Sequence, residues 1–212
     1  MKKNFIPTID ISALLKNLNS NKSKKIIKKI ERACVEVGFF QIINHGISKN
    51  QLLRISNIGN KFFKSSKRNK IKLAPKKWNN KNTNIYRGYF PNNVNGKEGL
   101  DIGDTKVTRK YAQSIKNRYI EYLNLNKSID KKSIKILSQY FNNIYILSEI
   151  LFKSVIKIYK DDTIISKKAF SRLKTLSTLR FNYYPNQSIP VEISKQDGVA
   201  LGCETHVDSG IF

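Results

Sequence analysis

The residues best suited to chemistry are His206 and Asp208, close to the end of the 212-residue sequence. In a strand, residues i and i+2 point to the same side, so this imidazole and this carboxylate would face one point. Such a pair can supply two of the three protein ligands of a non-haem Fe(II) site, which leaves positions open for other ligands. From the residues alone, a structural hydrogen bond between the two side chains is an equal alternative.

A complete triad of this kind needs a second histidine, and the sequence holds one other, His45. It lies in Asn44-His45-Gly46, a tripeptide that is typical of a turn. We therefore expect His45 to lie in a turn.

Helical spacing of apolar residues indicates the elements that would position these groups. It predicts helices over residues 23–37, 48–63, 133–159 and 166–173. Gly38 is expected to end the first helix in the left-handed conformation, and Ser48 to cap the second. Cys34 lies on the apolar stripe of the first helix, so we expect its thiol to pack in the core.

Short apolar or alternating segments predict strands between and after these helices. They cover residues 6–11, 39–43 (as a buried strand), 178–184 and 191–193. Residues 75–104 form either a long loop or a pair of short strands. The order, mostly helices and then a β region, predicts an α+β fold.

The formal net charge is +25, from 40 basic and 15 acidic residues. Lysine accounts for 32 of the basic residues and arginine for 8, and they are scattered along the chain. Base and phosphate recognition favours arginine, so we expect a compositional bias and not a nucleic-acid partner. With two cysteines and neither a signal peptide nor a membrane span, we expect a cytoplasmic protein.

Several segments, in the expected order, resemble the isopenicillin N synthase-like family of Fe(II)/2-oxoglutarate-dependent oxygenases. They are IPTIDIS (6–12), GFFQIINHGI (38–47), RGYFP (87–91), KEGLDIGD (97–104), LRFNYYP (179–185) and LGCETHVDSG (201–210). The resemblance implies a helical amino-terminal region followed by the first strands of an incomplete double-stranded β-helix, or jelly roll. The implied limits are 1–125 for the amino-terminal region, 126–175 for a long helix and connector, and 176–212 for the start of the jelly roll.

The resemblance also assigns roles to individual residues. It implies that His206 and Asp208 bind Fe(II), and that Asn182 and Tyr184 line the pocket of the cosubstrate 2-oxoglutarate. Tyr184 could donate its hydroxyl to a 2-oxoglutarate carboxylate, although an ordinary strand aromatic is an equal alternative. For Arg180 we expect a structural ion pair. The resemblance also implies that His45 is a structural turn residue and not the third metal ligand.

The implied activity is the hydroxylation, desaturation or cyclisation of a small molecule with dioxygen. The family's second metal-binding histidine and an Arg-x-Ser that holds 2-oxoglutarate follow the His-x-Asp motif, beyond Phe212. We therefore expect this chain to be a truncated form of such an enzyme. The alternative is a non-catalytic remnant or binding protein that cannot complete the metal site.

Overall fold

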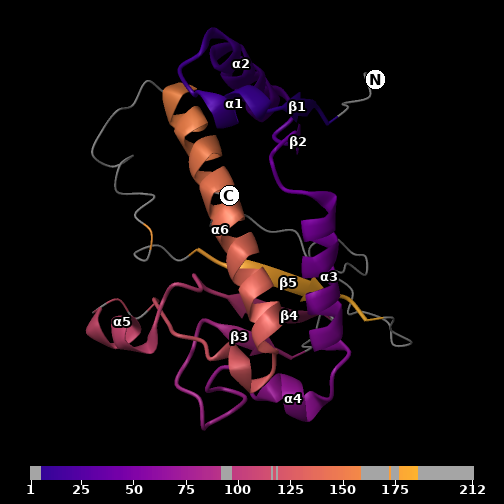
Figure 1. Ribbon diagram of the computed structural model, residues 1–212, viewed down its shortest axis with the longest axis vertical. Coiled ribbons are helices and arrows are strands. Elements are labelled where there is room, and N and C mark those ends of the chain that lie inside the picture. The colour runs from indigo at the N-terminus through magenta and orange to yellow at the C-terminus, as the bar shows by residue number, and fades with distance from the viewer. Residues whose placement is uncertain are drawn as a thin grey trace, which may run out of the picture. The chain divides into compact units, whose positions relative to one another are not determined.

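The computed structural model describes residues 6–91, 97–115, 117, 119–158, 172 and 177–185. Figure 1 shows its elements: β1 Thr8–Asp10, α1 Ser12–Lys16, α2 Asn21–Glu36, β2 Gln41–Ile43, α3 Lys49–Phe63, α4 Lys67–Ile71, β3 Gly88–Phe90, β4 Glu98–Ile102, α5 Arg109–Ser114, the 3₁₀ helix η1 Leu125–Lys127, α6 Lys131–Ile158 and β5 Leu179–Tyr183. The expected combination of helices and sheets is present. The chain divides into two compact units, Met1–Leu52 with Asn142–Arg172, and Leu53–Phe141 with Leu173–Phe212.

The first unit contains a two-stranded parallel sheet, in which Ile9 of β1 lies opposite Ile42 of β2. Aliphatic side chains from β1, α1, α2 and α6 form its core. They are Ile9, Ile11, Leu14, Ile27, Ile30, Ala33 and Leu147. The three members from α2 follow the spacing of one helix face, so this part of the core could be predicted from the sequence.

Helix α2 begins and ends at residues with local hydrogen bonds. The Oγ atom of Ser20 accepts a hydrogen bond from the Ser23 backbone N–H at 3.1 Å, which makes Ser20 the N-cap. The helix therefore begins two residues before the predicted start. Gly38 follows the helix with φ of +81°, and its N–H donates to the Ala33 carbonyl at 2.9 Å. The predicted glycine end is confirmed.

Two expectations of burial in this unit are wrong. Cys34 is exposed, because the buried stripe of α2 stops at Ala33 and the whole last turn, Cys34–Glu36, lies open. The strand predicted over 39–43 is shorter and not buried, since Phe39 is 71% and Ile43 46% exposed. Only Ile42 of β2 packs against the core, as the alternation of side chains along a strand requires.

The second unit contains a three-stranded antiparallel sheet in the order β3–β4–β5. Leu100 of β4 pairs with Phe181 of β5, and Asp101 with Arg180. The alternative of two short strands within 75–104 is confirmed by β3 and β4. The strand predicted over 178–184 is present as β5.

One face of this sheet packs against helices α3 and α6. The core includes Phe62 and Phe63 of α3, Leu137 of α6, and Leu100 of β4. The Tyr183 ring stacks on Phe63 with 5.0 Å between the ring centroids. At Gly59 of α3, an added Cβ would lie 2.7 Å from the Phe181 ring, so only glycine allows this helix to approach β5 so closely.

The long helices have the expected caps. The Oγ atom of Ser48 accepts a hydrogen bond from the Gln51 N–H at 3.1 Å, which confirms the cap of α3. Helix α6 confirms the long helix predicted over 133–159, although it begins two residues earlier, at Lys131. Its first half joins the core of the second unit and its later residues that of the first. Within the described ranges, no helix has both the length and the apolar character that crossing a bilayer requires.

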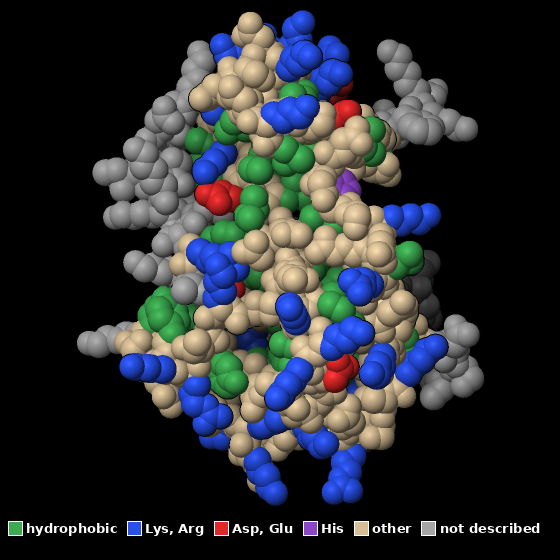
Figure 2. All heavy atoms as spheres, viewed as in Figure 1, with side chains coloured by type: hydrophobic (Ala, Val, Ile, Leu, Met, Phe, Trp, Pro, Cys, Tyr) green, Lys and Arg blue, Asp and Glu red, His purple; other side chains and the backbone are tan. Residues whose placement is uncertain are grey.

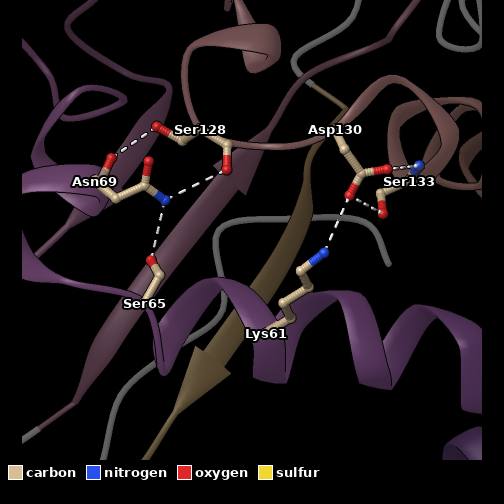
Figure 3. Close-up of polar contacts among 6 residues, drawn as sticks. All are labelled: Lys61, Ser65, Asn69, Ser128, Asp130 and Ser133. Atoms are coloured by element: carbon tan, nitrogen blue, oxygen red, sulfur yellow. Dashed lines mark hydrogen bonds and ion pairs between the residues drawn. The ribbon is translucent and has the colours of Figure 1, made fainter.

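The start of α6 is tied to α3 and α4 by a cluster of polar side chains (Figure 3). Asp130 accepts hydrogen bonds from the Ser133 N–H and hydroxyl, both at 2.9 Å, and lies 3.5 Å from the Lys61 Nζ. Ser128 donates its hydroxyl to the Asn69 carbonyl at 2.7 Å. Asn69 in turn donates to Ser65 at 3.1 Å. These contacts fix the position of the residues that lead into α6.

A bidentate ion pair joins β4 to β5. The Nε and Nη2 atoms of Arg180 donate to the two carboxylate oxygens of Asp101 at 2.7 and 2.6 Å. The Asp101 side chain is 4% exposed and that of Arg180 is 59% exposed. The structural ion pair expected for Arg180 is confirmed.

Several predictions fall on residues that the structure does not describe. The helix expected over 166–173 lies outside the described residues except for residue 172, and the strand expected over 191–193 lies wholly outside them. The incomplete jelly roll and the limits 1–125, 126–175 and 176–212 stay predictions. Strand β5 is the first strand of the region 176–212. It pairs with β4, which lies about 80 residues earlier in the sequence.

Replacing Asp130 with alanine should lower the melting temperature in a pH-dependent way. Hydrogen bonds from Ser133, with a smaller contribution from Lys61, lower the pKa of Asp130 from 3.8 to about 2. A carboxylate with a lowered folded-state pKa stabilises the fold above its unfolded-state pKa, and this contribution is lost as the pH falls through the folded-state value. The melting-temperature difference between wild type and Asp130→Ala should therefore be full above about pH 4 and disappear near pH 2.

Lys61→Ala is the matched control, because it removes only an exposed ion pair and should change the melting temperature little. If the melting-temperature difference between wild type and Asp130→Ala is the same at about pH 4 and near pH 2, the lowered pKa assigned to Asp130 is wrong.

Asp101→Asn should destabilise the second unit more than Arg180→Lys does. The first change removes a buried carboxylate and should cost about 2–3 kcal/mol of unfolding free energy. The second keeps the charge of an exposed side chain and loses only the paired hydrogen-bond geometry, at about 1 kcal/mol. Urea denaturation of both variants measures the two values. Equal losses of unfolding free energy in the two variants would contradict the stabilising role assigned to the buried Asp101 carboxylate.

Candidate functional site

The face of the second unit's sheet that points away from the core carries polar side chains of β5. Side chains alternate along the strand, and Leu179, Phe181 and Tyr183 pack against the core. Arg180 and Asn182 are exposed on the opposite face. Tyr184 follows the strand on the same two-residue repeat and is 52% exposed. We call Arg180, Asn182 and Tyr184 the outer face of β5.

The two residues predicted to bind the cosubstrate, Asn182 and Tyr184, thus share one side of the chain. Asn182 lies opposite Gly99 of β4, which has no side chain to cover the amide. Among the residues that the structure describes, neither side chain has a hydrogen-bond partner. A hydroxyl and an amide side by side can donate hydrogen bonds to the oxygens of a ligand carboxylate.

Two arginines and two carboxylates interact at this face and beside it. Asp101, 3% exposed, pairs with Arg180, and the hydrogen bond to Asp101 raises the pKa of Arg180. Arg87 is 5% exposed, and burial lowers its pKa while the charge of Asp101 opposes that change. The Arg87 Nη2 donates to the Ser177 carbonyl, next to the start of β5, at 3.5 Å. The charge of Glu121 acts on Arg87 in the same way as that of Asp101, so these two arginines are balanced by two carboxylates.

The core side of the same sheet holds a buried polar network. Lys70, 8% exposed, places its Nζ 2.6 Å from the Glu98 carboxylate of β4. The Tyr89 hydroxyl donates to the same oxygen at 2.8 Å, and burial together with that carboxylate raises the Tyr89 pKa. The charges compensate one another, so the network holds β3 and β4 together without leaving a group for chemistry.

The predicted metal ligands His206 and Asp208 lie outside the described residues. Within those residues, no three His, Cys, Asp or Glu side chains gather where they could hold a metal ion. His45 lies between Asn44, with φ of +54°, and Gly46, with φ of +80°, and its Nδ1 accepts a hydrogen bond from the Ile47 N–H at 3.2 Å. It is therefore a turn residue, as expected.

Sequence reasoning did not propose Arg87 and Asp101 as members of this site. Both belong to segments that the resemblance singled out, RGYFP and KEGLDIGD. What the sequence lacks is the antiparallel register that places Asp101 opposite Arg180. The available signal was that both charged residues occur in segments that could form short strands, since a charge that becomes buried in a sheet is seldom left unpaired.

Comparison with known proteins identifies the family. The family model for the amino-terminal region described as "non-haem dioxygenase in morphine synthesis" matches residues 6–131, more than half of the chain. The 2-oxoglutarate-dependent dioxygenase tropC of Talaromyces stipitatus is 34% identical over 102 residues, which are 48% of this chain and 30% of that protein. Isopenicillin N synthase of Streptomyces griseus is 25% identical over 210 residues, 96% of this chain and 62% of that enzyme.

The chain thus spans less than two thirds of the length of these curated relatives. Among solved structures, that of a full-length Neurospora crassa protein in complex with alpha-ketoglutarate and 5-formyluracil aligns with a TM-score of 0.61 and 19% identity. The alignment covers 85% of this chain and 52% of that one. At this identity the likeness concerns the fold alone, which in these oxygenases is a jelly roll.

Relatives include 2-oxoglutarate-dependent dioxygenases, and solved neighbours were determined with 2-oxoglutarate or with 2-oxoglutarate and Fe. The match to the family model covers the segments from IPTIDIS to KEGLDIGD that carried the resemblance. The resemblance inferred from these motifs is therefore confirmed, and the chain belongs to the non-haem Fe(II)/2-oxoglutarate-dependent dioxygenases, the family that includes isopenicillin N synthase.

Proposed function

We propose that this protein takes part in the oxidation of a small molecule by Fe(II), 2-oxoglutarate and dioxygen. The observation that carries the proposal is the outer face of β5. It presents Asn182 and Tyr184 on one side, beside the Asp101–Arg180 pair, in a chain that belongs to this family. Bound Fe(II) with 2-oxoglutarate and dioxygen supplies the oxidising chemistry for hydroxylation, desaturation or cyclisation.

His206 and Asp208 are the proposed metal ligands. A neutral imidazole and a carboxylate are the donor types that Fe(II) takes in this class of site, so the donor set fits the metal. Their i, i+2 spacing serves this role if the segment around them is a strand, which directs both side chains to one side. Residues 176–212, from just before β5 onward, are then the start of a jelly roll, as the likeness to the fold of the Neurospora crassa protein supports.

Asn182 and Tyr184 are the proposed contacts to 2-oxoglutarate. The Tyr184 hydroxyl donates a hydrogen bond to one carboxylate, and the Asn182 amide orients the same end of the molecule. Arg87 and Arg180 do not bind it directly, since Arg180 is held by Asp101 and Arg87 is buried. The residues of this chain thus bind and orient the cosubstrate.

The second candidate function is that of a non-catalytic binding protein. One observation favours it: His45 is engaged in its turn, which leaves His206 as the one histidine among these 212 residues for a metal. Two protein ligands with water in the other positions bind Fe(II) weakly and let it exchange. The two functions differ in whether these residues form succinate from 2-oxoglutarate.

Replacing either proposed ligand should weaken metal binding, and replacing His45 should not. We expect the 212-residue protein to bind one Co(II), used as an oxygen-stable substitute for Fe(II), with weak affinity, followed by its visible absorption. His206→Ala and Asp208→Ala should each lower that affinity at least about tenfold, because each removes one of two protein donors. His45→Ala is the matched control, since it removes the other histidine of the sequence.

Equal weakening by His45→Ala, or unchanged binding by His206→Ala, would contradict the assignment of the ligands. The same protein, loaded anaerobically with Fe(II) and 2-oxoglutarate and then exposed to oxygen, separates the two functions. Succinate formation that His206→Ala abolishes supports the enzyme. Metal binding without succinate supports the binding protein for these residues alone.

A further inference from the structure

A cavity of about 410 Å³ lies in the second unit, and no residue of the outer face of β5 lines it. Its walls come from the loop after α4, from α5, and from residues 120–127. All of its lining residues belong to the described part of the chain and to one unit. The volume is within the range of sites for small organic ligands.

The charged groups around this cavity are mostly cations. Lys72, Lys81, Arg109 and Lys127 line it, against one carboxylate, that of Glu121. The two Glu121 carboxylate oxygens accept hydrogen bonds from the backbone N–H groups of residues 85 and 86, at 2.6 and 2.9 Å. The acidic group is thus engaged with the backbone, and the cations remain in excess by three charges.

None of these cations is neutralised by a carboxylate among the described residues. Instead, the Lys127 ammonium donates to the amide oxygen of Asn82 at 2.6 Å. Asn82 is 6% exposed, and its own N–H groups donate to the carbonyls of Lys72 at 3.1 Å and Ala74 at 2.6 Å. A buried amide that makes all these hydrogen bonds has a fixed position, and it fixes the Lys127 ammonium at the cavity wall. The ammonium keeps two further N–H donors for a ligand.

Arg109 contributes a second oriented donor. Its guanidinium lies over the Tyr122 ring, 5.7 Å from the ring centroid. A cation–π contact of this kind uses no N–H donor in a hydrogen bond to a carboxylate, so the guanidinium N–H groups can still donate to an anion. Leu73 and Ile120, both buried, add apolar surface to the lining. The cavity therefore combines oriented cationic donors with an apolar wall.

We propose that this cavity binds a small organic anion with two or more negative charges, of the phosphate-ester or polycarboxylate type. Bringing such an anion among these cations relieves their mutual repulsion, which a neutral ligand cannot do. The apolar wall accommodates the carbon skeleton of the ligand. The site does not use the proposed metal ligands or the outer face of β5, so the proposal stands independently of the oxygenase function.

The general positive charge of the protein is the alternative explanation for any anion binding. Figure 2 shows lysine and arginine side chains over the whole visible face, with few acidic side chains among them. The control must therefore remove the same charge from outside the cavity. Lys76 and Lys110 are suitable, because both are exposed and neither lines it.

The test is calorimetric titration of the metal-free 212-residue protein with inorganic pyrophosphate and, separately, with citrate, at about 0.15 M salt. We expect one site for at least one of the two anions, and the pyrophosphate-to-citrate preference identifies phosphate or carboxylate as the recognised group. The Lys81→Gln/Arg109→Gln variant should weaken binding at least about tenfold, because two of the charged contacts are gone. The Lys76→Gln/Lys110→Gln variant, with the same net charge, should weaken it less than about twofold.

Absence of binding for both anions would overturn the proposal. Equal loss in the two double variants would overturn it as well, because diffuse surface charge would then explain the binding. All four substituted side chains are exposed, so the variants should keep the fold. Since no metal is added, failure here leaves the metal-binding experiment unaffected.

Discussion

The two-residue repeat of β5 is the constraint on which the candidate site depends. Leu179, Phe181 and Tyr183 must face the core, so Arg180 and Asn182 must face away. The close approach of Gly59 of α3 to the Phe181 ring also requires that Phe181 faces the core. A slip of one residue would turn every polar group of the outer face into the core, at a high cost in desolvation.

The charged side chains on the two faces of this sheet are paired in different ways. On the core side, Glu98 is compensated by Lys70 and by the Tyr89 hydroxyl, so the burial of these groups leaves no net charge. On the outer side, Asp101 pairs with Arg180, and the charges of Asp101 and Glu121 both act to raise the pKa of the buried Arg87. The first arrangement holds the strands together. The second fixes Arg180 on the same face as Asn182.

Local features of the fold could be predicted from the sequence because they depend on residues close together in the chain. The apolar spacing of α2 and α6, the cap at Ser48 and the glycine after α2 are of this kind. The exposure of Cys34 and Phe39 could not be predicted, because an apolar pattern does not tell whether another element covers it.

Within the candidate site, the sequence predicted Asn182 and Tyr184 through resemblance, and the ion pair of Arg180 from its place in the strand. It could not supply the partner of Arg180, since Asp101 lies 79 residues away and reaches it only through the β4–β5 register. The same limit applies to the 410 Å³ cavity, whose lining comes from three separate segments. Spacing identifies residues that share a face, and only the long-range pairing shows what lies opposite them.

The most direct test of the proposed cosubstrate site compares two variants, each of which lacks one tyrosine hydroxyl on one of the two faces of β5. Calorimetric titration of 2-oxoglutarate into the Mn(II)-loaded protein would compare Tyr184→Phe with Tyr183→Phe, two single-atom changes at neighbouring positions. We predict that Tyr184→Phe weakens binding about tenfold, the value of one hydrogen bond to a charged group, and that Tyr183→Phe, whose ring stacks on Phe63, leaves it unchanged. Unchanged binding by Tyr184→Phe, or equal weakening by both, would contradict the assignment of the outer face to the cosubstrate.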